Sequence, residues 1–364
     1  MKYLFAGGGT GGHIYPAIAI AKEILKNEKD AQILFVGTKK GLENELVPRE
    51  GFDLKTITVQ GFKRKLSLDT LKTIYKAMVG LKEANDILKE FKPDVVIGTG
   101  GYVGGPVLMM AALKGIPTLI HEQNAFPGLT NKLLSRFVKV VAVSFEESVK
   151  YFKNKEKVVV TGNPIRKELL KVTKEEGLKN LGFYSNKPLI VSVGGSRGAE
   201  KINFTMVEFL RQKDKNLQVL IITGANQYEK VLEKVKTETI NIDETVKIIP
   251  YCHNMQDVYA AADIIICRAG AITLAEITAK GVASILIPSP YVANNHQEYN
   301  ARVLEKAGAS YVILEKDLIA EELYKKVKYL IDNPQVLSKM RDNARKISKI
   351  DAAEKIYKLI KSIT

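Results

Sequence analysis

Short apolar runs alternate with amphipathic stretches along most of the chain. The runs are rich in Val and Ile, and segments whose apolar residues recur at helical spacing lie between most of them. Parallel strands that are covered by helices on both faces produce this pattern. The strands predicted for the first half are 3–6, 32–36, 54–59, 95–99, 117–120, 138–143 and 158–160. Those predicted for the second half are 189–193, 218–222, 246–249, 264–267, 284–288 and 311–314.

A glycine-rich segment, Gly7-Gly8-Gly9-Thr10-Gly11-Gly12-His13, joins the first predicted strand to a stretch with helical periodicity, 14–25. A strand, a glycine loop and a helix in this order present backbone N–H groups and a helix N-terminus to a phosphate. The arrangement recurs after the strand at 189–193, where residues 194–199 are glycine-rich and a helix is expected over 201–210. We therefore predict an α/β protein with two Rossmann-like domains, each built on a parallel sheet.

The chain has 364 residues, more than a single hydrophobic core usually holds. A polar connection with little strand character follows Gly162, and we place the domain boundary near Pro164. The predicted segments are an N-terminal domain at 1–163, a C-terminal domain at 164–340 and a C-terminal helix at 341–364. The last helical pattern, about 337–363, could close either domain, and the segment 341–364 could pack back on the N-terminal one.

Composition narrows the function classes. Hydrophobic residues make up 46% of the chain, which is typical of a globular protein. The net charge of +15 suits nucleic acid, an anionic membrane surface or anionic substrates, although a solvated lysine-rich surface would give the same surplus. The two cysteines, Cys252 and Cys267, lack metal-ligand spacing and make a disulfide framework unexpected. The uncharged window 95–113 holds five glycines and Pro106, so we interpret it as strand, glycine turn and buried helix rather than a membrane span.

The first glycine loop also fits a dinucleotide fingerprint. Gly7, Gly9 and Gly12 match G-x-G-x-x-G, which is normally followed about 20 residues later by an acid that binds the ribose. The next strand ends instead in Val36-Gly37-Thr38-Lys39-Lys40, with no acid. This disfavours NAD and leaves NADP open, because the two lysines could meet a 2′-phosphate.

Further polar or glycine-rich segments follow other predicted strands, where open α/β sheets bind ligands. Each has a structural alternative: tight packing for the glycines of 98–106, a helix cap around Asn124 in His121-Glu122-Gln123-Asn124, and a solvated loop for 294–300. In 268–276, Thr273 and Glu276 could form a capping box, or the carboxylate could accept both hydroxyls of a ribose.

These motifs, taken in order, resemble the MurG family of peptidoglycan N-acetylglucosaminyltransferases. The shared segments are Gly-Gly-Thr-Gly-Gly-His, Gly-Tyr-Val-x-Gly-Pro, His-Glu-Gln-Asn, Gly-Asn-Pro-x-Arg, Gly-Gly-Ser-x-Gly-Ala and Arg-x-Gly-Ala-x-Thr-x-x-Glu. The resemblance spans the chain and implies the GT-B fold, two Rossmann-like domains with the active site in the cleft between them. It also implies transfer of GlcNAc, with inversion, from UDP-GlcNAc to the C4 hydroxyl of MurNAc in undecaprenyl-pyrophosphoryl-MurNAc-pentapeptide (lipid I). The product is lipid II, for cell wall synthesis and hence cell shape and division.

The resemblance further implies a donor site. Its members would be Thr10, Gly11, Gly12, Asn124, Arg166, Ser196, Cys252, Thr273, Glu276 and Gln297. Ser196 and nearby amides would hold the diphosphate, Glu276 the ribose, and the backbone at Cys252 the uracil. Arg166 would lie near the donor phosphates, where a guanidinium could offset leaving-group charge. UDP-GlcNAc is a substrate, no other cofactor and no metal site are expected, and metal dependence stays open.

His13 is the candidate general base, since histidine is the side chain that titrates nearest neutral pH. It could instead position the acceptor or cap its loop. The acceptor pyrophosphate is assigned to Gly9, Gly101, Tyr102 and Gly104. The sequence departs from the family at Arg197, where glutamine is usual, and at His296, where a second amide is usual.

A lipid-borne acceptor requires that the protein reach the membrane. Residues 61–82 mix apolar and basic side chains, which suits an anionic membrane surface. The proposed patch comprises Phe62, Lys63, Arg64, Lys65, Ile74 and Met78, and a core-facing helix with a solvated lysine face is the alternative. The protein is therefore expected to be peripheral, on the cytoplasmic face of the cell membrane.

Three rival interpretations remain at this point. One is another GT-B transferase with a lipid acceptor, such as a diacylglycerol glycosyltransferase, which should lack His-Glu-Gln-Asn. The second is an NADP-dependent oxidoreductase. The third, a nucleic-acid-binding module, is disfavoured because the chain has no Trp and no ladder of basic and aromatic residues.

Overall fold

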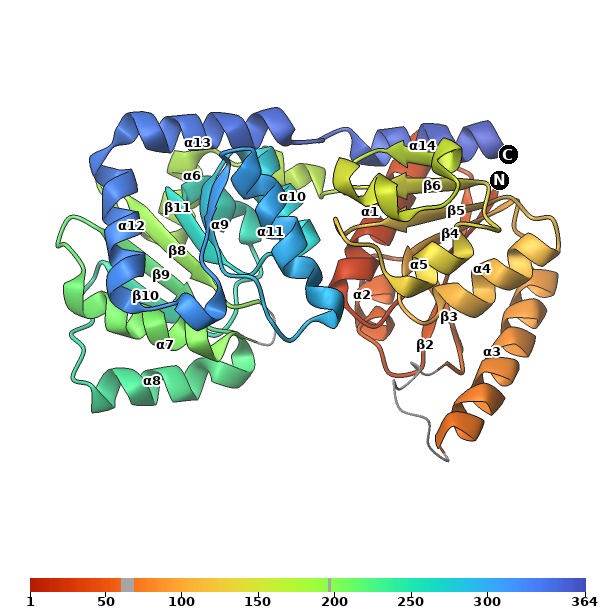
Figure 1. Ribbon diagram of the computed structural model, residues 1–364, viewed down its shortest axis with the longest axis horizontal. Helices are drawn as coiled ribbons and strands as arrows, with labels where there is room; N and C mark the ends of the chain where they lie inside the picture. Colours follow the sequence, from red (N-terminus) through yellow and green to blue (C-terminus); the bar gives the residue numbers. More distant parts are fainter. Residues whose placement is uncertain (60–68, 196–197) are drawn as a thin grey trace. The chain divides into compact units, whose positions relative to one another are not determined.

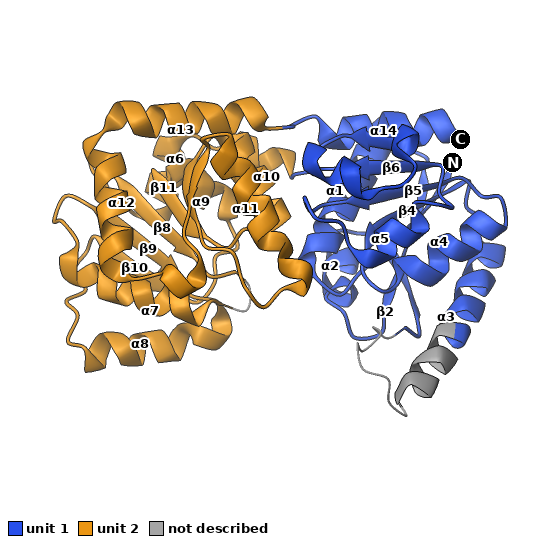
Figure 2. Cartoon of the chain, viewed as in Figure 1, with its two compact units in different colours: residues 1–165, 349–364 blue, residues 166–348 orange. Residues whose placement is uncertain are grey.

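The computed structural model describes residues 1–59, 69–195 and 198–364, with side chains for all of these except 69–77. The described chain divides into two compact units (Figure 2). Unit 1 comprises Met1–Ile165 and Lys349–Thr364, and unit 2 comprises Arg166–Ser348.

Unit 1 is built on a parallel sheet with helices on both faces (Figure 1). Its described strands run in the order β3-β2-β1-β4-β5-β6-β7. The strands are β1 (Lys2–Gly7), β2 (Gln32–Thr38), β3 (Asp53–Ile57), β4 (Val95–Gly100), β5 (Thr118–Glu122), β6 (Val140–Val143) and β7 (Val158–Val160). The α-helices are α1 (Gly11–Asn27), α2 (Glu43–Arg49), α3 (Asp69–Phe91), α4 (Gly104–Leu113), α5 (Leu129–Leu134) and α14 (Ala352–Ile363). Short 3-10 helices are η1 (Glu146–Tyr151) and η2 (Lys155–Lys157).

Alternating residues of β1 explain why its sequence is apolar throughout. Tyr3 and Phe5 pack on one face with α1 and α14, whereas Leu4 and Ala6 pack on the other with α3 and α4. Successive side chains of a strand point to opposite faces, so a strand that is buried on both sides needs an uninterrupted apolar run. The window 95–113 is β4 followed by α4, as predicted.

Unit 2 repeats this architecture. Its described strands are all parallel and run in the order β10-β9-β8-β11-β12-β13. They are β8 (Leu189–Val193), β9 (Gln218–Ile222), β10 (Val246–Ile249), β11 (Ile264–Cys267), β12 (Ala283–Leu286) and β13 (Ser310–Val312). The α-helices are α6 (Lys174–Leu181), α7 (Glu200–Phe209), α8 (Tyr228–Thr237), α9 (Met255–Ala261), α10 (Ala271–Lys280), α11 (His296–Lys306), α12 (Ala320–Asp332) and α13 (Pro334–Ile347). Short 3-10 helices are η3 (Lys167–Leu170), η4 (Leu210–Gln212), η5 (Ala225–Gln227), η6 (Ala293–Asn295) and η7 (Glu315–Asp317).

Both units are doubly wound. The chain moves outward from β1 through β2 and β3 and then returns to place β4 on the other side of β1; β8 and β11 stand in the same relation. Such a switch point opens a crevice at the carboxyl ends of the two central strands. The predicted fold class is therefore confirmed, and the glycine loops after β1, β4 and β8 all lie at switch points.

The single helix expected over about 337–363 is wrong. Two helices, α13 and α14, occupy this stretch, and a start at residue 341 would fall inside α13. The buried residues of α13, which include Leu337, Met340 and Ala344, pack in unit 2, whereas Ile356 and Ile360 of α14 join the core of unit 1. Ser348 is extended and ends the first helix, so the chain changes unit between two separate amphipathic helices.

Candidate functional site

The loop after β1 brings His13 against the loop after β4. The imidazole Nδ1 lies 3.0 Å from the carbonyl oxygen of Gly8, and a Cβ added to Gly100 would lie 2.7 Å from Cδ2 of His13. Gly100 and Gly101 have φ of +110° and +82°, a region that L-residues rarely adopt. A Cβ at Gly101 would also lie 2.5 Å from the Gly8 carbonyl oxygen. These glycines are therefore required by the close approach of two backbone segments.

The contact with Gly8 assigns the protons of the imidazole. A carbonyl oxygen only accepts hydrogen bonds, so Nδ1 must carry the proton that is donated to it. In the neutral ring Nε2 is then the basic nitrogen. His13 is partly exposed in the first turn of α1. The arrangement suits a group that takes a proton from a substrate through Nε2.

The other residues assigned to the site in these two loops lie at or just before the starts of α1 and α4. Thr10 is the N-cap of α1, but its side chain makes no capping hydrogen bond. Gly11 and Gly12 begin the helix, where backbone N–H groups have no intrahelical acceptor. Tyr102 is 63% exposed, and Gly104 begins α4. The N–H group of Gly9, by contrast, donates to a carboxylate within the protein.

That carboxylate belongs to Glu43, which the sequence did not single out. Its side chain is fully buried at the start of α2, where Oε2 accepts from Gly9 N at 2.8 Å and Oε1 accepts from Thr38 N at 2.6 Å. Burial would raise the carboxyl pKa, but the hydrogen bonds from Gly9 and Thr38 outweigh it and hold the pKa below its usual range. The sequence does hold a signal for it, because Glu43 is the first acidic residue after β2, three residues beyond Lys40.

The polar run after β5 points largely into the protein. His121 is fully buried, its Nε2 lies 3.1 Å from the Gly162 carbonyl oxygen, and Gln123 Nε2 donates toward its Nδ1 at 3.1 Å. Burial lowers the pKa of His121 to about 4, so the ring is neutral at physiological pH. His121 therefore ties β5 to the segment after β7 and is not placed to contact a substrate.

Glu122 and Asn124 shape the loop that follows. Glu122 Oε1 accepts from the backbone N of Asn124 at 2.9 Å and from its side-chain amide at 3.2 Å, while Oε2 accepts from Gly128 N and Asn131 Nδ2. The alternative interpretation of Asn124 as a helix cap is wrong, because Gly128 is the N-cap of α5. Asn124 is half-buried at the rim of this loop.

In unit 2, a buried carboxylate lies after β11. Glu276 Oε1 accepts from Arg166 Nη2 at 3.2 Å, and the hydroxyl of the fully buried Tyr259 also bonds this carboxylate. Burial raises the pKa of Glu276, although Arg166 and Tyr259 oppose that rise. The structure thus brings together Arg166 and Glu276, two residues that were predicted from the sequence. It adds Tyr259, which was not predicted because an aromatic residue in an apolar helix is typical of a hydrophobic core.

The capping-box alternative for Thr273 and Glu276 is wrong. Gly270 is the N-cap of α10 and has no side chain to cap it, so Thr273 and Glu276 both lie within the helix. The first turn of α10 contains no acidic residue and follows β11 at the switch point of unit 2. Its N-terminal amides can therefore face an anion. The capping box that the structure does contain pairs Thr173 with Glu176 at the start of α6.

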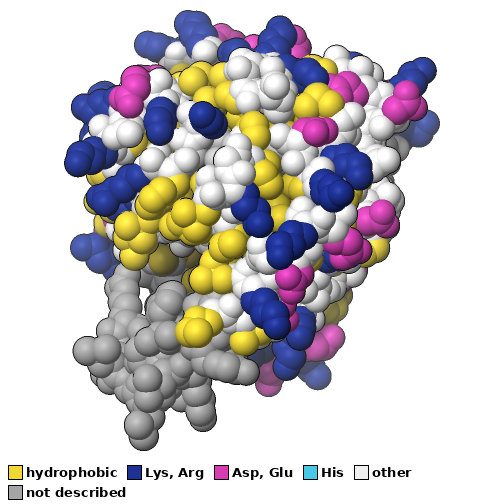
Figure 3. Space-filling view, turned by 90° about the vertical axis from the view of Figure 1, so that its right-hand side faces the viewer, with side chains coloured by type: hydrophobic (Ala, Val, Ile, Leu, Met, Phe, Trp, Pro, Cys, Tyr) yellow, Lys and Arg dark blue, Asp and Glu magenta, His cyan; other side chains and the backbone are white. Residues whose placement is uncertain are grey.

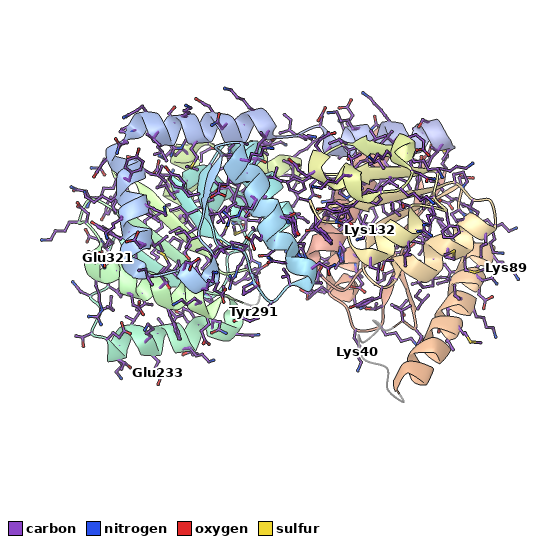
Figure 4. The ribbon with its side chains drawn as sticks, in the orientation of Figure 1. Lys40, Lys89, Lys132, Glu233, Tyr291 and Glu321 are labelled. Carbon is purple, nitrogen blue, oxygen red and sulfur yellow. The ribbon has the colours of Figure 1, made fainter. Side chains whose placement is uncertain are left out.

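The remaining assigned residues of unit 2, Cys252 and Gln297, lie in segments that follow the carboxyl ends of parallel strands. Cys252 is half-buried between β10 and α9. Gln297 lies in the first turn of α11, and its amide oxygen accepts from Ser289 N at 2.9 Å, so its amide nitrogen is the donor that a sugar hydroxyl could use. Tyr291, which is labelled in Figure 4, is 85% exposed in the segment between β12 and α11.

Several predicted residues lie in parts of the chain that the structure does not describe. Ser196 and Arg197 fall outside the described residues, as do Phe62, Lys63, Arg64 and Lys65, and the side chain of Ile74 is not described. Met78 is 63% exposed on α3. Within the described ranges, no cluster of three or more His, Cys, Asp or Glu residues is arranged to hold a metal ion. None of the helices, over the residues that the structure describes, is both long and apolar enough to cross a bilayer.

Two doubly wound units, each with glycine loops at its switch point, define a GT-B-like protein. Residues 3–143 match the N-terminal domain of glycosyltransferase family 28, and residues 189–360 match its C-terminal domain. The chain belongs to glycosyltransferase family 28. This membership removes the dinucleotide-dependent oxidoreductase as an interpretation of the first glycine loop.

Relatives extend the likeness over the full length. A protein of Thermoanaerobacter sp. (strain X514), named UDP-N-acetylglucosamine--N-acetylmuramyl-(pentapeptide) pyrophosphoryl-undecaprenol N-acetylglucosamine transferase, is 96% identical over 100% of both chains. The crystal structure of Acinetobacter baumannii MurG is 32% identical, covers 99% of both chains and superposes with a TM-score of 0.79. A UDP-GlcNAc 2-epimerase from Neisseria meningitidis, bound to UDP-GlcNAc, shares the fold at a TM-score of 0.72 with 16% identity over 100% of both chains.

The buried histidine predicts a pH dependence of stability. Unfolding releases His121 to bind a proton near pH 6.5, whereas the folded ring resists protonation until about pH 4, so stability present above pH 6.5 is lost as the pH falls toward 4. At about pH 5 the loss should be about 2 kcal/mol. Urea unfolding at neutral pH and at about pH 5, for wild type and His121→Gln, checks this: the variant should lack this part of the decrease. Equal pH dependence in both proteins would contradict it.

Proposed function

We propose that this chain transfers GlcNAc from UDP-GlcNAc to the MurNAc unit of undecaprenyl-pyrophosphoryl-MurNAc-pentapeptide and so forms lipid II for peptidoglycan synthesis. It is a glycosyltransferase by its family. The observation that carries this assignment is the 96% identity to the Thermoanaerobacter enzyme along the whole of both chains. Proteins so similar over their full length share their binding surfaces, so the donor and acceptor in that enzyme's name are the ones assigned here.

Unit 2 would bind the donor at the carboxyl ends of β8 and β11. The N-terminus of α10 would face the diphosphate, and the uracil would lie against the backbone at Cys252. Ser196, which lies outside the described residues, stays a predicted ligand of the diphosphate. Glu276 would accept the ribose hydroxyls, and Thr273 lies one turn before it. Since Arg166 already pairs with Glu276, its guanidinium stands close to where the ribose and the phosphates would lie. Gln297 would contact the sugar from the start of α11.

Unit 1 would supply the acceptor side and the base. Gly101, Tyr102 and Gly104, at the start of α4, would bind the lipid pyrophosphate, and Thr10, Gly11, Gly12 and Asn124 would contact the GlcNAc. Gly9 would contribute through its backbone conformation, with φ of +87°, rather than through an N–H bond, because that group is held by Glu43.

The reaction is an inverting displacement at C1 of GlcNAc. Nε2 of His13 takes the proton of the C4 hydroxyl, and the resulting oxygen attacks C1. The bond from C1 to the β-phosphate oxygen breaks, and UDP departs with the bonding electron pair, leaving a β-1,4 link. Arg166 and the N-terminus of α10 would stabilise the negative charge that develops on the diphosphate.

The acceptor's lipid carrier calls for a membrane-facing surface on unit 1. Leu129, Leu133 and Phe137 are each at least half exposed. Leu129 and Leu133 are four residues apart and therefore lie on one side of α5, and Phe137 follows in the turn after that helix. We call these three residues the apolar face. Lys132, on the same helix and labelled in Figure 4, supplies a positive charge, and its Nζ lies 4.8 Å from the ring centroid of Phe126.

A pocket adjoins this surface. Its volume is about 380 Å³, and its lining consists mainly of apolar side chains of α3, α4 and α5, including Leu81, Met109, Leu129 and Leu133, together with Tyr102. Figure 3 shows hydrophobic side chains gathered on this side of the protein among lysines and arginines. Exposed apolar side chains within a basic surrounding suit an anionic bilayer surface. We therefore place the protein at the cytoplasmic face of the membrane, as a peripheral protein.

Removing the apolar face should weaken membrane binding. Leu129→Ser combined with Leu133→Ser should lower partitioning onto phosphatidylglycerol vesicles about tenfold, because each exposed leucine contributes roughly 1 kcal/mol or less on insertion. Vesicle sedimentation measures this. The control is Ile242→Ser, an exposed apolar residue of unit 2, which should not change partitioning. Unchanged partitioning of the double variant would contradict the assignment of this surface.

Transfer of radiolabelled GlcNAc to a short-chain lipid I analogue tests the function itself. His13→Ala should lower kcat by about 10²-fold or more, because a general base is removed. Glu276→Gln should raise the Kd of UDP-GlcNAc by roughly 10- to 100-fold, since hydrogen bonds to a charged group contribute about 1.5–3 kcal/mol. Glu321→Gln, on an exposed turn of α12, is the control and should change neither quantity.

The outcomes separate the claims. Absence of transfer by a wild-type protein that binds UDP-GlcNAc would overturn the acceptor and leave the donor site in place. Full activity in His13→Ala would move the base to another residue. Unchanged donor affinity in Glu276→Gln would remove the ribose assignment.

A further inference from the structure

We infer that Glu43 is a positioning residue for His13, acting through the peptide group that joins Gly8 to Gly9. The inference rests on the proposed function, in which His13 is the base. The two hydrogen bonds concerned involve opposite ends of one planar peptide: its N–H belongs to Gly9 and donates to Glu43 at 2.8 Å, and its C=O belongs to Gly8 and accepts from His13 Nδ1 at 3.0 Å. Glu43, one peptide and the imidazole thus form a continuous relay.

The carboxylate is fixed from its other side as well. Oε1 of Glu43 accepts from the backbone N of Thr38 at 2.6 Å and from Thr38 Oγ1 at 2.7 Å. Glu43 therefore links the loop after β2 to the loop after β1. The Glu43 side chain is fully buried, so its carboxylate has little contact with water.

Glycine at three positions makes room for this carboxylate. A Cβ at Gly8 or Gly41 would collide with the carboxyl group of Glu43, and a Cβ at Gly37 would collide with its Cγ. Gly8 follows β1, Gly37 lies near the end of β2 and Gly41 follows β2, and only Gly8 belongs to the segment that faces the proposed ligand. The clearance is consequently specific to Glu43, and it explains glycines that phosphate binding alone does not require.

The relay has two effects on the imidazole. It holds the 8–9 peptide plane in the orientation that receives the Nδ1 proton, so Nε2 is left as the base. It also polarises that peptide, because an N–H group that donates to a carboxylate makes its own carbonyl a stronger acceptor. The imidazolium that forms when His13 takes a proton is stabilised by the same interaction, as a carboxylate stabilises the histidine of a catalytic dyad.

The first test is the tautomer of His13, read from nitrogen-15 NMR of histidine-labelled wild-type protein at neutral pH. The relay requires the Nδ1-protonated form. Observation of the Nε2-protonated form as the dominant species would overturn the inference without any variant. In Glu43→Gln, whose amide cannot accept from both Gly9 and Thr38, the Nε2-protonated form should rise.

Kinetics supply the second test. Glu43→Gln should lower kcat about tenfold or more and leave the Kd of UDP-GlcNAc unchanged, because donor binding is assigned to unit 2. The same change on a His13→Ala background should have no further effect on kcat, since Glu43 acts only through His13. The matched control is Glu45→Gln, since Glu45 is an exposed residue of the same helix, α2, and lies two residues after Glu43. This variant should behave as wild type.

The outcomes distinguish this inference from the proposed function. A loss of kcat in Glu43→Gln that persists in full on the His13→Ala background would show an effect that bypasses His13 and would overturn the relay. If His13→Ala retains activity, the base assignment fails, while the tautomer measurement still decides whether Glu43 orients the ring. If Glu43→Gln does not fold, the wild-type tautomer decides the matter, since a dominant Nε2-protonated form would overturn the relay.

Discussion

The close approach of two backbone segments is the constraint on which the site of unit 1 depends. The pairing of β1 with β4 shifts register between Ala6 and Gly7, so that Gly7 lies opposite Gly100. From that point the two loops run against one another, with the backbone of Gly101 over Gly8 and Gly100 beside the ring of His13. No side chain fits between them. The glycines here are thus set by contact within the protein, and the imidazole is held by backbone on one side and by its bond to Gly8 on the other.

Most of the fold could be predicted from the sequence. Every predicted strand exists, with ends displaced by three residues or fewer, because strands buried on both faces require apolar runs whose ends are marked by glycine or polar residues. The break between α13 and α14 was not predicted. Both are amphipathic helices, and periodicity does not reveal that their apolar faces pack in different units.

The candidate site was harder to predict, for a physical reason. Sequence spacing identifies residues that a loop brings together, but not partners supplied by distant segments. Glu43 binds Gly9, 34 residues away, and Arg166 binds Glu276, 110 residues away. The sequence also did not reveal which way the side chains at the end of β5 point. His121 and Glu122 were expected near a ligand, yet both are buried and make hydrogen bonds within unit 1.

Glu43 and Glu276 are both buried carboxylates, but they differ in a way that distinguishes a structural group from a ligand-binding group. Glu43 accepts from two backbone N–H groups and a hydroxyl, and these bonds lower its pKa despite burial. Glu276 is bonded by two side chains, one of them the partly exposed Arg166, and burial raises its pKa. A carboxylate held by backbone amides keeps its partners as long as the loops keep their shape. One held by movable side chains gains from further donors, because a carboxylate can accept about four hydrogen bonds. The ribose hydroxyls assigned to Glu276 would supply such donors and thereby reduce the cost of its buried charge, whereas Glu43 has nothing comparable to gain from a ligand. The same residue type thus serves two purposes, decided by whether its hydrogen-bond donors come from the backbone or from side chains.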